Sequence, residues 1–67
     1  MRKVSEVPLT DLKVGDAVIA PNGVRGRIAH ISEKPDREDY TIDFEWDNGN
    51  KSMSVWHFWC DKIEYAS

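Results

Sequence analysis

The chain has 67 residues, a formal net charge of −3 and a single cysteine. A chain of this length forms one domain with a small core, and one cysteine excludes an internal disulfide. One cysteine and two histidines do not reach the four ligands of a structural zinc site. With no apolar run near the roughly 20 residues of a membrane span and no hydrophobic signal core, we expect a cytoplasmic protein without a cofactor.

The charge is unevenly distributed. Residues 1–31 carry five basic and three acidic side chains, whereas residues 32–67 carry four basic and nine acidic ones. Much of the acid lies in a hydrophilic loop predicted for residues 32–39, either a solvated spacer or a site for a basic partner. The acidic balance disfavours binding dominated by nucleic-acid phosphates. No membrane partner is expected, because no apolar run is long enough to span a bilayer.

Strand signals begin at residues 17–20, a short apolar run that ends at the turn Pro21-Asn22-Gly23. A second strand is predicted for residues 24–31, where Ile31 breaks the alternating pattern and indicates a bulge or a strong bend. Residues 40–46 show the clearest period of two, with alternating Tyr, Ile, Phe and Trp, which predicts one buried and one wet face.

The pair Asn48-Gly49 follows that strand and predicts a hairpin with a type I′ turn. Residues 51–55 then pair back, residues 56–60 form a short 3₁₀-like turn, and residues 62–65 make the last strand. The expected fold is all-β, a strongly bent five-stranded small barrel over residues 9–65. Residues 1–8 are an N-terminal extension and residues 66–67 a tail.

This order of elements resembles the SH3-like small-barrel superfamily, which includes Tudor and KOW domains. Three runs carry the resemblance: Leu12-Lys13-Val14-Gly15-Asp16-Ala17-Val18, Gly23-Val24-Arg25-Gly26-Arg27-Ile28 and Trp46-Asp47-Asn48-Gly49. In these runs Gly26 looks like the small residue that lets the second strand coil sharply. The resemblance implies an SH3-like barrel and a choice among protein, nucleic-acid and small-molecule binding.

A narrower resemblance concerns Ser54-Val55-Trp56-His57-Phe58, followed by Ile63-Glu64. These residues are spaced like the corresponding segments of plasmid-borne, trimethoprim-insensitive dihydrofolate reductases, which are tetramers of small SH3-like barrels around one pore. Trp56, His57 and Phe58 stand where that family has the glutamine, isoleucine and tyrosine that line the pore. Because an indole replaces the glutamine amide, the resemblance implies the fold and not the reductase chemistry.

The residues around the predicted 3₁₀ turn are the main candidate site. Side chains three residues apart share one side of such a turn, so Trp56 and Trp59 form one pair and His57 and Cys60 the other. So small a protein cannot bury both pairs, and an exposed tryptophan tends to mark an interface. The predicted binding residues are Tyr40, Trp56, His57, Trp59 and Asp61.

Each of these residues also has a structural interpretation. The rings of Tyr40, Phe44 and Trp46 can fill the core, and so can those of Trp56 and Trp59. A thiol–imidazole nucleophile from His57 and Cys60 has no orienting third group and no cleft, so an inert buried Cys60 and a protein without enzymatic activity are expected.

Two arginines are the candidates for nucleic-acid contact. Arg25 and Arg27 lie on the polar face of the second predicted strand, opposite Asp43 and Glu45 of the third. Cross-strand ion pairs are the structural interpretation, and contacts to RNA phosphates are the functional one.

The sequence thus predicts a non-enzymatic SH3-like module that binds a partner protein, or itself, through aromatic residues around Trp56 and Trp59. The alternatives are a KOW- or Tudor-like nucleic-acid-binding accessory protein, and a small-molecule site formed between subunits of a symmetric oligomer.

Overall fold

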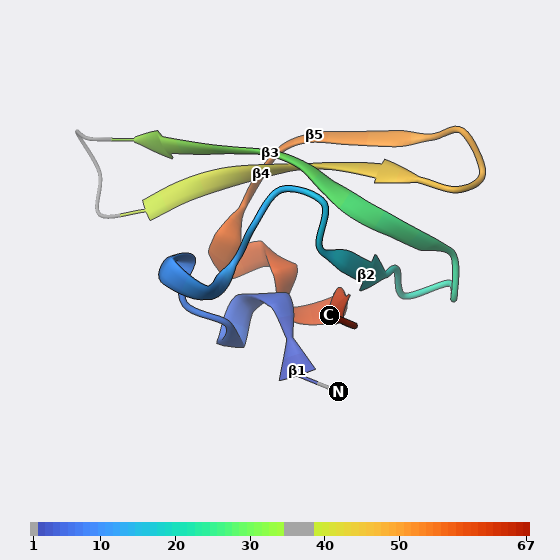
Figure 1. Cartoon of the computed structure of the whole chain (residues 1–67), viewed down its shortest axis with the longest axis horizontal. Coiled ribbons are helices and arrows are strands. Elements are labelled where there is room, and N and C mark those ends of the chain that lie inside the picture. The colour runs from blue at the N-terminus through green and yellow to red at the C-terminus, as the bar shows by residue number, and fades with distance from the viewer. Residues whose placement is uncertain (1, 35–38) are drawn as a thin grey trace.

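The computed structural model describes residues 2–34 and 39–67, so the middle of the predicted charged loop, residues 35–38, lies outside the described residues. The described residues form one antiparallel sheet in the order β1-β6-β2-β3-β4-β5, with short 3₁₀ helices at its lower side (Figure 1). The strands are β1 (Arg2–Lys3), β2 (Ala17–Ile19), β3 (Arg25–Lys34), β4 (Asp39–Trp46), β5 (Lys51–Trp56) and β6 (Glu64–Tyr65). The 3₁₀ helices are η1 (Val4–Glu6), η2 (Leu9–Asp11) and η3 (His57–Lys62).

The prediction of an all-β protein is confirmed, but the predicted five-stranded closed barrel is wrong. The described chain has six strands in an open sheet, because β5 leads directly into η3 instead of pairing with β1. The helix η3 contacts β1, β4 and β5, and η1 packs on η3 (Figure 1). Short helices therefore cover the side on which a barrel would close. The predicted 3₁₀ turn before the last strand is confirmed as η3.

The centre of the core comes from alternate residues of β4. Tyr40, Ile42 and Phe44 are buried, which confirms the buried face predicted from the period of two. The opposite face differs at Thr41, which is only 3% exposed. Thr41 stands directly opposite Trp56 in the β4–β5 ladder, where paired side chains lie close together. The bulky indole thus accounts for the burial of a polar residue on the face predicted to be wet.

The strand β3 is longer than predicted and carries the predicted bulge. Its register against β4 shifts between Ile28 and His30, which leaves Ala29 as the additional residue. Pairing then continues to Lys34, opposite Asp39, so both ends of the predicted loop belong to strands. Together with β5, the two strands form the long upper layer of the molecule (Figure 1).

The β4–β5 hairpin is confirmed, but its turn is not type I′. Only Gly49 has a positive φ, +90°, whereas a type I′ turn requires positive φ at Asn48 as well. The N–H of Gly49 donates to the carbonyl of Trp46 at 3.0 Å, and the N–H of Trp46 donates to the carbonyl of Asn50 at 2.9 Å. This is the three-residue loop in which a left-handed glycine follows a type I turn.

Further along, β5 contains a bulge of its own. Ile42 pairs with Val55 and Phe44 pairs with Ser52, so two residues of β5 face one residue of β4. The second of the two, Ser54, has a φ of +53°, and its N–H donates to Oδ1 of Asp43 at 2.7 Å. The Asp43 carboxylate therefore stabilises an unusual backbone conformation on an edge strand.

A close approach between β3 and β4 requires the glycine at position 26. Gly26 pairs with Trp46, and a Cβ at Gly26 would stand 2.5 Å from Cε3 of that indole. The ring also stacks on Phe44, with centroids 5.4 Å apart, and its Nε1 donates to Oγ of Ser52 at 2.9 Å. The absence of a side chain at Gly26 thus lets the Trp46 ring lie against β3.

The first residues take part in the fold instead of extending from it. Val4 and Val7 are fully buried, and the N–H of Val4 donates to the carbonyl of Ile63 at 2.8 Å. The preceding residues, Arg2–Lys3, pair with β6. The segment described as an extension in the sequence analysis therefore supplies a strand and two core side chains.

One tyrosine joins the last strand to the loop before β2. The hydroxyl of Tyr65 donates to Oδ2 of Asp16 at 2.7 Å, and the Arg2 guanidinium lies 5.7 Å from the centre of the same ring. The hydrogen bond to the carboxylate raises the pKa of the Tyr65 phenol, and burial and the negative charge of Asp16 add to the effect, while Arg2 opposes it. The neutral phenol is therefore the form that the fold stabilises.

Candidate binding surface on the η3 helix

The helix η3 begins directly at the end of β5. Trp56 is the N-cap residue, with extended backbone angles of φ −61° and ψ 139°, and the next residue already belongs to the helix. A 3₁₀ helix has three residues per turn, so side chains at i and i+3 point in the same direction. The short helix thus separates its residues into a side that faces the core and a side that faces outward.

The inward side carries His57 and Cys60. Cys60 is fully buried, and Nε2 of His57 lies 2.9 Å from the carbonyl oxygens of both Val4 and Val7. Carbonyl oxygens only accept hydrogen bonds, so Nε2 carries a proton and donates to both. The imidazole also stacks on Tyr40, with centroids 4.6 Å apart and planes 21° from parallel. His57 thereby joins η3 to the N-terminal segment and to β4.

The outward side carries three aromatic rings, Trp56, Phe58 and Trp59, which we call the aromatic patch. Phe58 is 56% exposed and Trp59 is 64% exposed, while Trp56 is half-buried. The ring centres of Trp56 and Phe58 are 6.0 Å apart, and those of Phe58 and Trp59 are 5.4 Å apart with the rings edge to face. These are the separations of interacting aromatic pairs, so the three rings form one continuous apolar surface.

The predicted binding residues are therefore divided between two environments. Trp56 and Trp59 lie in the aromatic patch, and Asp61 is exposed on the same helix. Tyr40 is 8% exposed and stacks on His57 on the inward side. Phe58 was not among the predicted binding residues, although it lies between Trp56 and Trp59 in the sequence and contacts both rings in the structure.

The two arginines lie elsewhere on the sheet. Arg27 pairs with Glu45 across β3 and β4, at 3.2 Å between Nη2 and Oε2, which confirms a predicted cross-strand ion pair. The two side chains are 67% and 43% exposed, so the pair contributes at most about 1 kcal/mol. Trp56 pairs with Thr41, four residues from Glu45 along β4, which corresponds to about 13 Å. The structure thus places the arginines away from the aromatic patch.

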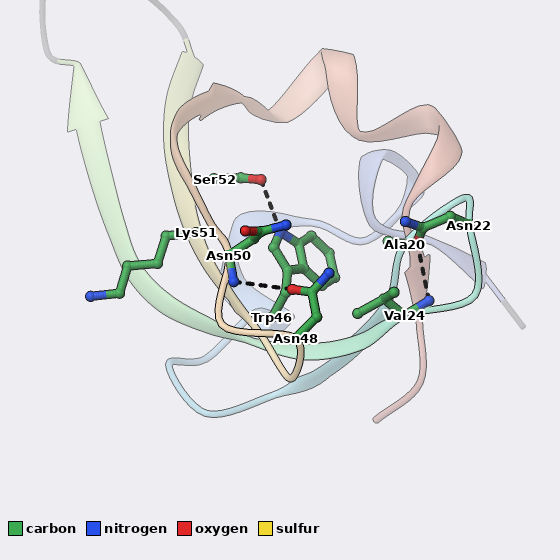
Figure 2. A pocket seen from close by; sticks show the side chains of 8 residues that line it. All are labelled: Ala20, Asn22, Val24, Trp46, Asn48, Asn50, Lys51 and Ser52. Carbon is green, nitrogen blue, oxygen red and sulfur yellow. Dashed lines mark hydrogen bonds between the residues drawn. The ribbon is translucent and has the colours of Figure 1, made fainter.

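A pocket that was not predicted from the sequence lies between two turns. The turn that joins β2 to β3 and the β4–β5 hairpin turn face each other across the Trp46 ring, and the pocket has a volume of about 350 Å³ (Figure 2). Besides Ala20 and Lys51, its lining residues are Asn22, Val24, Trp46, Asn48, Asn50 and Ser52. In the sequence the asparagines indicated only turns. Their side chains come from two turns that lie far apart in the chain, so only the folded structure shows that they line one pocket.

Two further observations concern metals and membranes. Within residues 2–34 and 39–67, no three His, Cys, Asp or Glu side chains gather in a group that could hold a metal ion. Over the same residues, no helix is long and apolar enough to cross a bilayer.

Comparison of the chain with protein-family models, with curated proteins and with solved structures gives no match.

Proposed function

We propose that this protein is a small, non-enzymatic SH3-like binding module that binds a partner protein through the aromatic patch. The observation that carries the proposal is that Phe58 and Trp59 are each more than half exposed while they contact one another. Leaving such rings in water is unfavourable, and tryptophan is among the residues that contribute most to protein–protein binding.

The inward side of η3 supports this proposal because it holds the backbone beneath the patch in place. Trp56 is fixed at the end of β5, and His57 and Cys60 hold the helix against the core. A partner that covers the rings therefore does not have to order the backbone that carries them, which lowers the entropy cost of binding. The exposed carboxylate of Asp61 on the same helix adds a polar rim.

Electrostatics support a protein partner more than a nucleic acid. The net charge is −3, and Arg27 is already paired with Glu45. A protein that binds nucleic-acid backbones presents several unpaired basic side chains on one face. A protein surface can instead cover the patch without a favourable long-range charge.

The experiment compares the wild-type protein with the double variant Phe58→Ser, Trp59→Ser. Both residues are exposed, so the variant should fold, and Met53→Ser is the matched control because Met53 is exposed on β5 outside the patch. We expect an affinity capture in which wild type and Met53→Ser retain the same protein and the double variant does not. Calorimetry with that purified partner then measures the interaction directly.

Self-association is tested in the same set of proteins by sedimentation velocity over a range of concentrations. A dimer that is lost only in the double variant would make a second copy the partner. The proposal is rejected if wild type and double variant show the same mass and retain the same proteins.

A further inference from the structure

The pocket between the two turns is a second site, on a different part of the molecule from the aromatic patch. We propose that it binds a neutral sugar ring, with the Trp46 indole as the apolar surface and asparagine side chains as hydrogen-bonding groups. The pocket measures about 350 Å³. Small-molecule sites range from about 300 to 1,000 Å³, so this one admits a single ring and not an extended molecule.

The indole is fixed in position before any ligand arrives. One part of the ring lies against Gly26, its centroid is 5.4 Å from that of Phe44, and its N–H is already donated to Ser52. The remaining part borders the pocket and offers a π surface with no free polar group. Such a surface carries partial negative charge and attracts C–H groups, which line the faces of a sugar ring.

The asparagine amides are also oriented in advance. Oδ1 of Asn22 accepts the N–H of Val24 at 3.1 Å, and Oδ1 of Asn48 accepts the N–H of Asn50 at 3.0 Å (Figure 2). These bonds occupy the oxygen end of each amide, so the NH₂ end remains as a donor. A hydroxyl oxygen is a suitable acceptor for it.

The arrangement around the ring favours a sugar over a nucleobase. Figure 2 shows Asn50 on one side of Trp46 and Asn22 with Val24 on the other, while the Asn48 amide overlaps the lower part of the ring in this view. Polar groups on both sides of an apolar surface match a ligand with hydroxyls around its whole perimeter. A base concentrates its polar atoms on fewer edges and, in a nucleotide, carries a phosphate.

Charge also favours a neutral ligand. Figure 2 shows the Lys51 side chain directed away from the indole and the amides, and the other side chains that line the pocket are uncharged. The protein as a whole carries −3, which repels an anion at long range. An uncharged polyhydroxylated ring experiences no such repulsion.

The experiment is a titration of the ¹⁵N-labelled protein, followed by the indole N–H of Trp46 and the side-chain NH₂ groups of the asparagines. The probes are glucose, galactose, mannose and N-acetylglucosamine; sorbitol controls for hydroxyl groups without a ring, and adenosine tests a nucleobase. We expect at least one sugar to give saturable shifts confined to the pocket.

The double variant Asn22→Asp, Asn48→Asp sharpens the test. Aspartate keeps the oxygen that accepts each backbone N–H but removes the NH₂ donor, so the turns remain while affinity falls about tenfold or more. Lys62→Ala, at an exposed position of η3 outside the pocket, changes the net charge in the same direction without altering the pocket, and should bind as wild type does. Asn50→Ala is the second variant if the double variant does not fold.

The proposal is overturned if no sugar gives saturable shifts, if sorbitol gives equal shifts, if only adenosine binds, or if the folded asparagine variants bind as wild type does. The Phe58→Ser, Trp59→Ser protein should bind the sugar normally. The outcome is therefore independent of the one for the aromatic patch.

Discussion

Trp46 and Trp59 are the same residue type in opposite situations. Trp46 lies across Gly26, stacks on Phe44 and donates its N–H to Ser52, so both its apolar body and its polar atom have partners within the fold. Trp59 is 64% exposed and contacts Phe58, which is itself exposed. The local backbone thus decides the role of an aromatic residue: a strand register directs one ring inward, and the pitch of a 3₁₀ helix directs the other outward.

Replacing each tryptophan by alanine tests most directly whether Trp46 is structural and Trp59 is not. Trp46→Ala should lower the free energy of unfolding by about 3 kcal/mol, because it removes a packed ring and leaves a cavity. Trp59→Ala should change it by less than about 0.5 kcal/mol, as surface substitutions do. Urea unfolding followed by circular dichroism measures both. Equal losses for the two variants would contradict the distinction between a structural and an exposed tryptophan.

Gly26→Ala tests why the Trp46 ring can lie where it does. The added methyl would collide with the indole and with the backbone of Glu45, so we expect a loss of about 1–3 kcal/mol in unfolding free energy. Gly49→Asn is the control, since position 49 is open and asparagine tolerates its positive φ. If alanine at position 26 proved harmless, the close approach of β3 to the indole would not be required.

The support beneath the aromatic patch is tested at His57. His57→Ala removes the donor to the carbonyls of Val4 and Val7 and should cost about 1–2 kcal/mol, because the Val7 carbonyl loses this donor and the Val4 carbonyl keeps only the N–H of Val7. Amide hydrogen exchange should increase in η1 and η3 before it does in β3 and β4. His30→Ala, at an exposed position of β3, is the matched control and should leave exchange in η1 unchanged.

The smallest effect is expected at Tyr65, which belongs to neither site. Because its pKa is raised above the ordinary value of 10.0, mainly by the hydrogen bond to Asp16, the fold favours the neutral phenol. The resulting stabilisation is complete below pH 10 and is lost as the pH rises through the raised pKa. A pH titration of the Tyr65 Cζ chemical shift measures it, and Asp16→Asn should move the midpoint down toward that of the urea-unfolded chain.

Regular patterns made much of the sheet predictable. The alternation of Tyr40, Ile42 and Phe44 gave the buried face of β4, and the interrupted alternation before Ile31 gave the bulge in β3. The contribution of Val4 and Val7 could not be predicted, because helices of three residues leave no periodic signal. The sixth strand comes from this N-terminal segment, and the sheet stays open because β5 leads into η3 instead of pairing with β1.

The candidate sites were predictable to different degrees. The division of η3 into two sides follows from three residues per turn, and Trp56, Trp59 and Cys60 lie accordingly. The ion pair of Arg27 with Glu45 was predictable from the alternation of the two strands. Asp43 was also predicted to face an arginine, but it accepts a hydrogen bond from the N–H of Ser54, because the bulge in β5 places that N–H beside it. The pocket could not be predicted, because no local sequence pattern indicates that two turns far apart in the chain lie side by side.

The bulge at Ser54 has a consequence for how the protein behaves at high concentration. The strand β5 is an edge of an open sheet, and a straight edge would allow another molecule to add a strand and continue the sheet. The left-handed residue at position 54, held by Asp43, interrupts the row of amides and carbonyls on this edge. The chain can therefore present exposed aromatic rings at the end of β5 while resisting indefinite growth into fibrils along the strand that carries them.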